Sequence, residues 1–450
     1  VQIDPTYRLA DIDMMDNYKS PTTKVARESQ SLRFENYIYH IPSWKQYESY
    51  WRPDIWYNTV DGVKLGLHID GSYMNFMRKL YCTVWFNTRL GSKLIYRPFE
   101  GESWWHNASP IDYTVRYETP LKIISKKINW GLESRFMDGY AKHSIYTNYL
   151  FTKKDNIKIE LTSLYRNSDI TNAYLFYPSE WSSYSSGSND TRKNSYLQIQ
   201  LNHPYTKKLG TGLMKFTIRT PFTYDYSYFQ GEVLHKKSWK KLDISARGFV
   251  RLGMGKDIPN ESALFLQGGN PEEMMENKFT RSQGIIPLEM GGYSTTEFSN
   301  LHAGGGLNLR GYTGYFAIDE NANGKYLNYK GRSGAAVNIE IEFDRLVKFR
   351  PKILRDYLHL DTYLFGDAGA ISRGTLNVNN IPQLNPVNQW SKIRMDAGIG
   401  AALTIKKFGA LEKVNPFTIR FDMPFFISST PYAQQNQFDF RWLLGVSRAF

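Results

Sequence analysis

The sequence has little of what braces a small secreted domain or builds a metal cluster. Cys82 is the single cysteine among 450 residues, which excludes a disulfide framework and any zinc site made of several cysteines. No apolar run approaches the roughly 18 residues that a membrane-spanning helix needs. The eight histidines form no H-E-x-x-H motif, and the chain has neither a G-x-S-x-G turn nor a P-loop. These absences argue against a helical membrane protein and predict no metal and no cofactor.

Positive charge is in excess but is not concentrated. The chain has 56 lysines and arginines against 43 aspartates and glutamates, a formal net charge of +13. Because the basic residues are scattered and form no long block, we expect no nucleic-acid partner. Two other interpretations of the charge stay open. It could attract anionic lipid headgroups, or it could belong to a solvated surface or a lumen lined by positive side chains.

Aromatic residues, in contrast, are abundant. They make up 15% of the chain, beside 41% hydrophobic and 22% charged residues, and this composition excludes a disordered chain. So many aromatic side chains require either many half-buried pleated surfaces or aromatic belts at a membrane interface.

The first 58 residues differ from the rest. They contain scattered prolines and charges, as in Asp4-Pro5 and Ser20-Pro21, and show no sustained periodicity. We predict an irregular lead-in or linker over 1–58 and one large domain over 59–450. Val1 is neither an initiator methionine nor the start of a basic and then apolar leader, so we expect a mature chain or the C-terminal part of a longer one.

From about residue 59 onward the dominant pattern is strict alternation of polar and apolar residues. It is clearest in 338–343, 393–405 and 417–425, and it recurs earlier in 63–70 and 197–202. A period of two residues indicates strands with two different faces. About eleven such segments precede residue 270 and five follow residue 330. The pattern therefore predicts about 16 strands, each of the roughly 10 residues that cross a bilayer obliquely.

The two faces decide between a soluble sandwich and a barrel. A sandwich also alternates, because its apolar face packs on a second sheet. Here the polar face carries charges of both signs beside glycines, as the wall of a wet lumen would. Aromatic residues rim the apolar face: Tyr81, Trp85, Trp104, Trp105 and Trp442. Since hydrocarbon leaves no partner for an open edge, the sheet has to close. We predict an all-β fold, a closed antiparallel transmembrane β-barrel.

The end of the chain supports a bacterial outer-membrane location. Residues 438–450 alternate and finish on an aromatic carboxy-terminal residue, Phe450. This strand resembles the signal by which bacterial outer-membrane proteins are recognised for assembly, although Arg448 stands where that signal usually has an apolar residue. The location implies a multi-pass protein surrounded by the lipid bilayer and lipopolysaccharide.

Two motifs carry a more specific resemblance. The first lies within a long non-alternating stretch, 266–332, and the second follows about 50 residues later on a predicted strand. Their residues are Leu309, Arg310, Gly311 and Tyr312 in the first, and Phe365, Asp367 and Gly369 in the second. Together they resemble the paired signatures of the BamA-like superfamily, which includes outer-membrane assembly factors, two-partner-secretion transporters and bacterial surface antigens. In that family the first motif lies on the sixth extracellular loop and the second on the thirteenth strand.

The resemblance implies a lumenal ion pair. The loop would fold into the barrel, where Arg310 would meet Asp367 as its main acceptor and Glu340 or Glu342 as a second one. An arginine fork suits a carboxylate bidentately, and Gly311 permits a turn that a side chain would block. Alternation is consistent with this, because both glutamates point away from the neighbouring isoleucines. The alternative is a surface turn whose arginine faces solvent.

The resemblance also implies a function. In the family, the seam between the first and last strands can admit a strand of a client protein by edge pairing. Here the seam would lie between about 63–70 and 438–448, with Gly445 either a weak point or a glycine that relieves crowding. The implied role is insertion of outer-membrane proteins or protein translocation. Client proteins and periplasmic or surface lipoprotein subunits are the implied partners.

Other functions have weaker support. Residues 4–13 and 51–56 are similar to the junction in fusions of Bacteroidota gluzincin aminopeptidase-like domains to such barrels, so the chain could be the membrane anchor of a larger protein. Asp319–Gly324 has the spacing of half a calcium loop, but Lys330 replaces the glutamate that would complete it. No nucleophile, base and acid converge on one rim, and we expect no enzyme.

Overall fold

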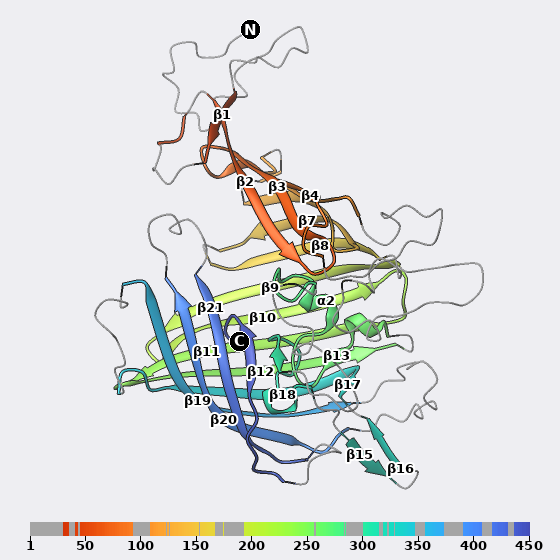
Figure 1. Ribbon diagram of the computed structural model, residues 1–450, viewed down its shortest axis with the longest axis vertical. Helices are drawn as coiled ribbons and strands as arrows, with labels where there is room; N and C mark the ends of the chain where they lie inside the picture. The colour runs from red at the N-terminus through yellow and green to blue at the C-terminus, as the bar shows by residue number, and fades with distance from the viewer. Residues whose placement is uncertain are drawn as a thin grey trace, which may run out of the picture.

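The computed structural model describes residues 30–35, 41–43, 46–92, 109–122, 124–125, 127–152, 154–166, 174, 193–255, 258–282, 284, 300–314, 318–321, 324–327, 329–346, 356–372, 390–406, 416–430 and 436–450. These residues form an all-β protein with one large sheet of 18 strands (Figure 1). The prediction of an all-β fold is confirmed. Within the described residues, no helix is long and apolar enough to cross a membrane.

Most strands pair with the next in the chain, antiparallel. The wall strands up to residue 254 are β2 (Tyr47–Asn58), β3 (Gly62–Tyr73), β4 (Met77–Asn87), β5 (Ile111–Pro120), β6 (Ile128–Met137), β7 (Tyr140–Leu150), β8 (Asn156–Arg166), β9 (Lys193–Lys207), β10 (Gly210–Pro221), β11 (Ser227–Trp239) and β12 (Leu242–Met254). β12 then pairs with β18 (Ser333–Glu342), followed by β19 (Leu358–Ser372), β20 (Arg394–Ile405), β21 (Phe417–Ile427) and β22 (Leu443–Val446). Two short strands, β1 (Gln30–Phe34) and β14 (Leu301–His302), complete the sheet.

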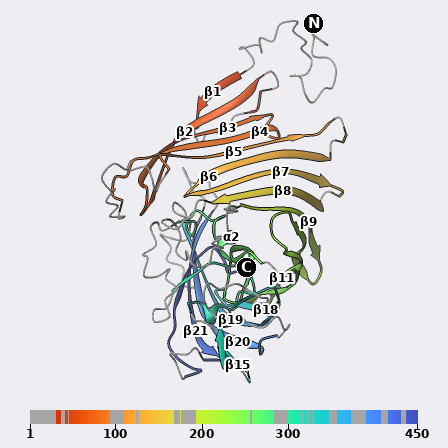
Figure 2. The same cartoon turned by 90° about the vertical axis from the view of Figure 1, so that its right-hand side faces the viewer.

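The stretch between β12 and β18 is here called the inner segment (255–332), and its described residues form short elements. These are η4 (Asn260–Ser262), β13 (Leu264–Phe265), α2 (Pro271–Met274), β14, η5 (Arg310–Tyr312), β15 (Ile318–Asn321), β16 (Gly324–Leu327) and β17 (Lys330–Gly331). In Figures 1 and 2 the strands from β9 onward curve around α2 and the C-terminus, while β1 to β8 continue as a flatter part of the sheet.

The wall strands are polar inside and apolar outside. On β18, Val337 and Ile339 are 52% and 41% exposed, whereas Asn338 and Glu340 are 0% and 1% exposed. The same inversion holds on β21, where Phe421 is exposed and Arg420 is fully buried. A soluble sheet in contact with water shows the reverse preference, because charged side chains lose hydration on burial. Alternation in the sequence therefore predicted the two faces of these strands.

The sheet is not a closed cylinder. Among the described strands no pairing joins β2 to β22. Ten wall strands, β3 to β12, lie between residues 59 and 270, where about eleven were expected, and five, β18 to β22, follow residue 330. Each end of the wall carries a short parallel strand. β1 pairs with β2 over Tyr47–Trp51, and β14 pairs with Leu444 and Gly445 of β22.

The first wall strand begins earlier than predicted. Residues 47–58 form β2, not part of an irregular lead-in, and the predicted first strand around 63–70 is β3, which is paired on both sides. Pro53 argued against a strand here, because proline has no backbone N–H to donate within a sheet. It lies on the outermost long strand, past the end of the β1 pairing, where a missing N–H is tolerated. Residues 4–13, Trp104 and Trp105 lie outside the described residues.

The last strand is shorter than predicted. β22 covers Leu443–Val446 rather than most of 438–450, and Phe438 makes only an isolated bridge to Phe426. At Asp319–Gly324, where the sequence has the spacing of half a calcium loop, Asp319–Asn321 belong to β15, which pairs antiparallel with β16 from Gly324 onward, and residues 322–323 lie outside the described residues.

Candidate functional site

The inner segment packs on the concave side of the sheet through an apolar cluster. Its buried residues come from two stretches of the segment and from the facing wall: Leu264, Phe265, Leu266, Leu307, Leu309 and Tyr312 from the segment, with Phe249, Ala336, Ile371 and Ile427 from the wall. Gly305 and Gly306 have φ of +142° and +50°, and a Cβ on Gly305 would lie 2.8 Å from the Gly269 Cα. Glycine therefore lets the two stretches cross closely and aims η5 at the wall.

Arg310 of η5 is held by two carboxylates of the wall. Its Nε donates to Asp367 Oδ2 at 2.8 Å and its Nη2 to Asp367 Oδ1 at 3.0 Å. Nη1 donates to Glu340 Oε1 at 2.6 Å, and the Arg310 backbone N–H reaches Asp367 Oδ2 at 3.3 Å. The side chain is completely buried. A bidentate, buried pair of this kind fixes both the position and the orientation of the segment tip.

The two predicted glutamates have different partners. Glu340 joins Arg310, while Glu342 pairs with Arg448. Arg448 also donates to Glu340 Oε2 at 2.9 Å and lies 3.5 Å from Asp361 Oδ2. The residue that departs from the usual terminal signal thus supplies a second cation to a wall that would otherwise carry excess negative charge.

Aromatic rings and a glycine complete the surroundings of Arg310. The Phe365 ring centroid lies 4.0 Å from the guanidinium carbon and that of Phe450 lies 5.9 Å away, so both predicted aromatic residues face the site. Gly369 leaves space for the segment, because a Cβ there would be 3.0 Å from Leu309 Cδ1. The second motif therefore provides the acceptor, a ring face and room for the first motif.

Gly311 is required by close approach to a residue that the sequence did not single out. Its φ is not positive, but a Cβ would lie 2.6 Å from the Cβ of Asp396 on β20. Asp396 is 2% exposed and is directly opposite Asp367 in the pairing of β19 with β20. Its place among the even, polar positions of 393–405 was the available signal, but alternation cannot show which polar residue lies under the segment.

The predicted seam glycine has a packing role. A Cβ on Gly445 would lie 2.5 Å from Arg420 Nη2. Arg420 pairs with Asp422, and its Nη2 lies 2.6 Å from His302 Nδ1 on β14. Gly445 therefore makes room for a guanidinium that ties the inner segment to the end of the sheet, which favours the crowding interpretation over the weak point.

The first part of the inner segment makes contacts of the opposite polarity. Its glutamates face basic residues of the wall, a set that sequence reasoning missed. Glu272 accepts from Arg219 at 3.0 and 3.1 Å, and Glu276 accepts from Arg135 at 2.9 Å and Lys142 at 3.1 Å. Glu261 pairs with Arg166, and Glu273 lies 3.7 Å from Arg251. Basic side chains of β6, β7, β8, β10 and β12 thus face the inner segment.

Two groups of side chains have the composition of a metal site. In the first, Lys64 Nζ lies 3.0 Å from both Asp61 and Asp138 and pairs with Asp112, so a lysine already provides the cation. Arg281 of the inner segment adds a contact of 2.5 Å to Asp138.

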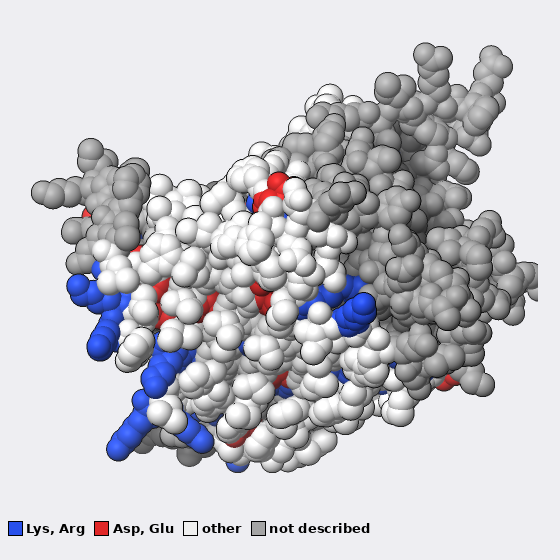
Figure 3. Space-filling view, turned by 90° about the horizontal axis from the view of Figure 1, so that it is seen from below, with Lys and Arg blue, Asp and Glu red and all other residues white. Residues whose placement is uncertain are grey.

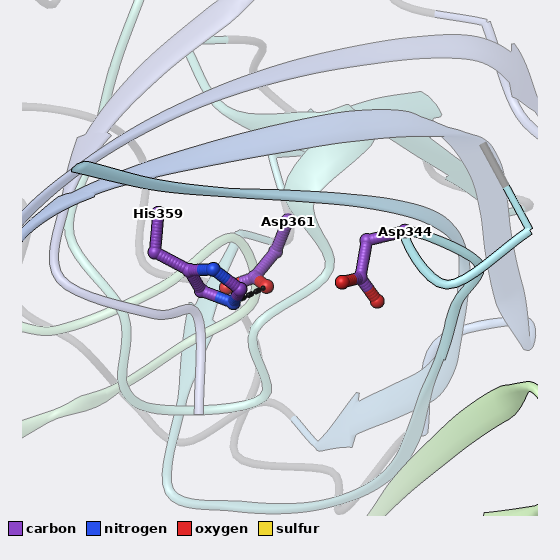
Figure 4. Close-up of side chains that lie close together, drawn as sticks. All are labelled: Asp344, His359 and Asp361. Atoms are coloured by element: carbon purple, nitrogen blue, oxygen red, sulfur yellow. Dashed lines mark ion pairs between the residues drawn. The ribbon is translucent and has the colours of Figure 1, made fainter. Parts of the chain in front are cut away.

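The second group consists of Asp344, His359 and Asp361, whose ligand atoms lie within 4.8 Å of one another (Figure 4). His359 Nε2 is 2.7 Å from Asp361 Oδ1, and Arg448 also lies beside Asp361. Because basic groups already surround Asp361, the electrostatics do not favour a further cation.

Comparison with known proteins gives similarity at the level of architecture. No protein-family model and no curated protein matches the chain. Among solved structures, it is similar to BamA from Haemophilus ducreyi lacking POTRA domains 1–3, with 10% identity, 89% of this chain and 70% of that chain covered, and a TM-score of 0.43. It is also similar to OpdK from Pseudomonas aeruginosa with vanillate (10% identity, 88% and 96% covered, TM-score 0.37) and to a bacterial polysaccharide outer membrane secretin (8%, 86% and 89%, 0.32). At these scores the likenesses decide neither closure of the sheet nor a function.

Proposed function

We propose that this chain is a transmembrane β-barrel of a bacterial outer membrane, with the inner segment folded into its lumen. The observation that carries the proposal is the inversion of the wall. Val337 and Ile339 are exposed, while Asn338 and Glu340, which alternate with them, are buried. Surrounding hydrocarbon accounts for this arrangement and water does not. Closure between β2 and β22 belongs to the proposal, because an open edge in hydrocarbon would leave backbone groups without partners.

The membrane proposal is tested by spin labels on adjacent residues of opposite faces. Leu132 and Glu133 form one pair on β6, and Leu403 and Thr404 form another on β20. Leu132 and Leu403 are 40% and 38% exposed, whereas Glu133 and Thr404 are less exposed. In lipid vesicles we expect labels at the leucines to contact oxygen but not a water-soluble nickel chelate, and labels at their neighbours to show the opposite preference. Equal accessibility within each pair would contradict a hydrocarbon-facing outer surface.

We infer further that the barrel acts in insertion of outer-membrane proteins or in protein translocation. The support is the arrangement at the segment tip, where the motif arginine, Arg310, is bound bidentately by the motif aspartate, Asp367, on the thirteenth wall strand counted from β2. A segment pinned in this way braces the wall from within at β18 and β19, while β14 of the same segment contacts the end strand β22. Client proteins would pair with an end strand, and periplasmic or surface lipoproteins would be partner subunits.

A specific observation favours the second candidate, a barrel that anchors a larger protein without catalysing a reaction. Both ends of the wall are covered by the chain itself, β2 by β1 and β22 by β14. An added strand needs a free row of backbone donors and acceptors. If β1 and β14 stay in place, neither end strand offers that row along its covered residues, and the barrel serves only as an anchor.

The two candidates are separated by locking β1 onto β2. Leu32 is opposite Ser49 in the pairing, so Leu32→Cys with Ser49→Cys, in a Cys82→Ser background, allows a disulfide between the strands. The measurement is folding of an unfolded small outer-membrane barrel into vesicles that contain this chain. An insertion role that uses the β2 edge predicts activity in the reduced protein and a loss of most of it on oxidation.

The matched control locks two strands away from the seam. Thr206 is opposite Thr211 between β9 and β10, and a disulfide there leaves the end strands unchanged. We expect equal activity of this control in both redox states. Equal activity of the locked and unlocked β1 variants would exclude use of the β2 edge, and no activity in either state would favour the anchoring role.

A further inference from the structure

The outer face of the sheet carries a group of lysines where two neighbouring hairpins end. The β9–β10 and β11–β12 hairpins each turn through two residues, Lys208-Leu209 and Lys240-Lys241. Together with strand-end residues they give five exposed lysines, which we call the basic rim: Lys207, Lys208, Lys237, Lys240 and Lys241. Figure 3 shows lysine and arginine side chains projecting from one edge of the molecule.

The basic rim lies at the end of an apolar band. Along the outer face of β11, Phe229 and Val233 are followed at every second residue by His235, Lys237 and Trp239. The apolar band continues onto the neighbouring strands, because Phe229 is opposite Ile218 and Leu252, both about half exposed. The outer face of β11 thus passes from apolar residues to a strand end that carries His235, Lys237 and Trp239. Cationic and aromatic side chains beside an apolar face are typical of the level at which a membrane protein meets lipid headgroups.

Aromatic side chains form a shelf beside the lysines. Tyr205 stacks on His235 with ring centroids 5.9 Å apart, and its hydroxyl lies 3.0 Å from His235 Nδ1. The His203 ring also stacks with Tyr205, with centroids 6.3 Å apart. Gly212 makes room for the shelf, since a Cβ there would be 2.4 Å from the Tyr205 ring. The rings are therefore fixed by packing rather than mobile on the surface.

Acidic residues near the basic rim are already engaged. Asp155 of the neighbouring β7–β8 hairpin contacts His203 Nδ1 at 2.6 Å, and Asp243 pairs with Arg345 at 2.7 Å. Across the described part of the chain, none of the five rim lysines takes part in an ion pair. Trp239 and Leu209 between them remain 55% and 67% exposed. Uncompensated cations beside exposed apolar side chains call for a ligand that is both anionic and amphipathic.

We propose that the basic rim binds the anionic headgroups of phospholipids in the leaflet that faces the short turns. The inference rests on the proposed transmembrane location. Outer-membrane barrels turn briefly on the periplasmic side and carry long loops on the other. Here the wall ends that carry the rim have two-residue turns, and the inner segment starts from the opposite ends. The lysines contact phosphate, the stacked Tyr205 and His235 rings lie along the glycerol region, and Trp239 at the end of β11 lies among the headgroups beside Lys240.

The test compares lipids retained by the full chain. The protein is reconstituted in phosphatidylcholine vesicles with or without phosphatidylglycerol, extracted mildly and examined by native mass spectrometry. We expect the parent to retain phosphatidylglycerol in several-fold preference. Lys237→Gln combined with Lys240→Gln and Lys241→Gln should remove most of that preference, without changing the heat-modifiable gel mobility that reports folding.

The matched control changes equal charge on other hairpins of the same side. Lys122, Lys127 and Lys154 are exposed at the β5–β6 and β7–β8 turns. Their replacement by glutamine should leave the lipid preference intact. A parent without preference, or a rim variant that keeps it, would overturn the proposal and favour an acidic protein as the occupant. Failure of the chain to float with vesicles would instead overturn the transmembrane location itself.

Discussion

The two parts of the inner segment carry opposite charges into the wall. The first part, around α2, presents glutamates to arginines and a lysine of β6 to β12, and the second part presents Arg310 to acids of β18 and β19. Shifting the segment along the wall would place like charges together, at a cost larger than that of a neutral loop. The segment is therefore positioned by its charge pattern as well as by its apolar cluster.

The two parts differ in how strongly each is held. Arg310 is completely buried and has two carboxylate partners, Asp367 and Glu340, that are equally buried. Glu276 in the first part is 46% exposed at its side chain, although its partner Arg135 is nearly buried. Exposed pairs contribute little because water screens them. The contact at Glu276 should therefore be released more easily than that at Arg310, whereas Glu261 and Glu272 of the first part are held in buried pairs with Arg166 and Arg219.

The largest effect is expected from Arg310→Ala. The change leaves Asp367 and Glu340 buried with one cation fewer, a cost of roughly 3–5 kcal/mol. We expect altered heat-modifiable mobility and faster proteolysis of residues 258–314. Arg345→Ala serves as the control, because Arg345 is half exposed in its pair with Asp243. If the Arg310 and Arg345 variants were equally protected from protease, Arg310 would not hold the segment.

A smaller effect is expected from Glu272→Gln on α2. Glu272 accepts hydrogen bonds from Arg219, Ser262 and Tyr196, and loss of its charge should cost roughly 1–3 kcal/mol. Proteolysis near α2 should rise while the region around Arg310 stays protected. The paired change Glu272→Arg with Arg219→Glu should restore part of the protection if the charge pair, rather than helix packing, is responsible.

Acid should act on the same contact. Burial alone would raise the pKa of Glu272, but Arg219 and the hydrogen bonds from Ser262 and Tyr196 outweigh it and hold the pKa below its usual value. The stabilisation is therefore complete above the ordinary glutamate pKa of about 4.3 and is lost as the pH falls through the lower, folded-state value. Protection of α2 should persist in mild acid and fall only below that range. A fall already near neutral pH would contradict this pairing.

Sequence alternation explains how much of this site could be anticipated. It assigns Asp367 and Glu340 to one face because neighbouring residues fix the face of a strand, and the motif spacing brings Arg310 to the same part of the wall. It could not reveal Glu272 with Arg219, since the glutamate lies in an irregular stretch whose path depends on tertiary contacts. Arg448 was misleading for a similar reason, because its partners come from strands distant in the sequence.

The errors in the predicted fold also have physical causes. Pro53 and the charges around it broke the apparent rhythm of β2, although its outer face still carries Trp51 and Ile55. Closure of the sheet could not be predicted from alternation. Alternation shows which face of a strand is apolar, but not which strands it pairs with. The short strands β1 and β14, which pair with the two end strands, could not be predicted from the sequence. Strands of five and two residues have too few positions to show a period of two residues.

The smallest effect is expected from Gly445→Ala, which changes the contact between the second part of the segment and the end of the sheet. The added Cβ would lie 2.5 Å from Arg420 Nη2 and force this guanidinium, which also contacts His302, to shift. Because the crowded atoms belong to a side chain, we expect a cost of about 1 kcal/mol.

The matched control is Gly248→Ala on β12, where a Cβ would meet nothing within 4 Å. A weak-point glycine predicts the reverse, since alanine would stiffen the strand. Thermal unfolding should therefore show a lower midpoint for the Gly445 variant than for the Gly248 variant, and a higher one would return Gly445 to the role of a weak seam.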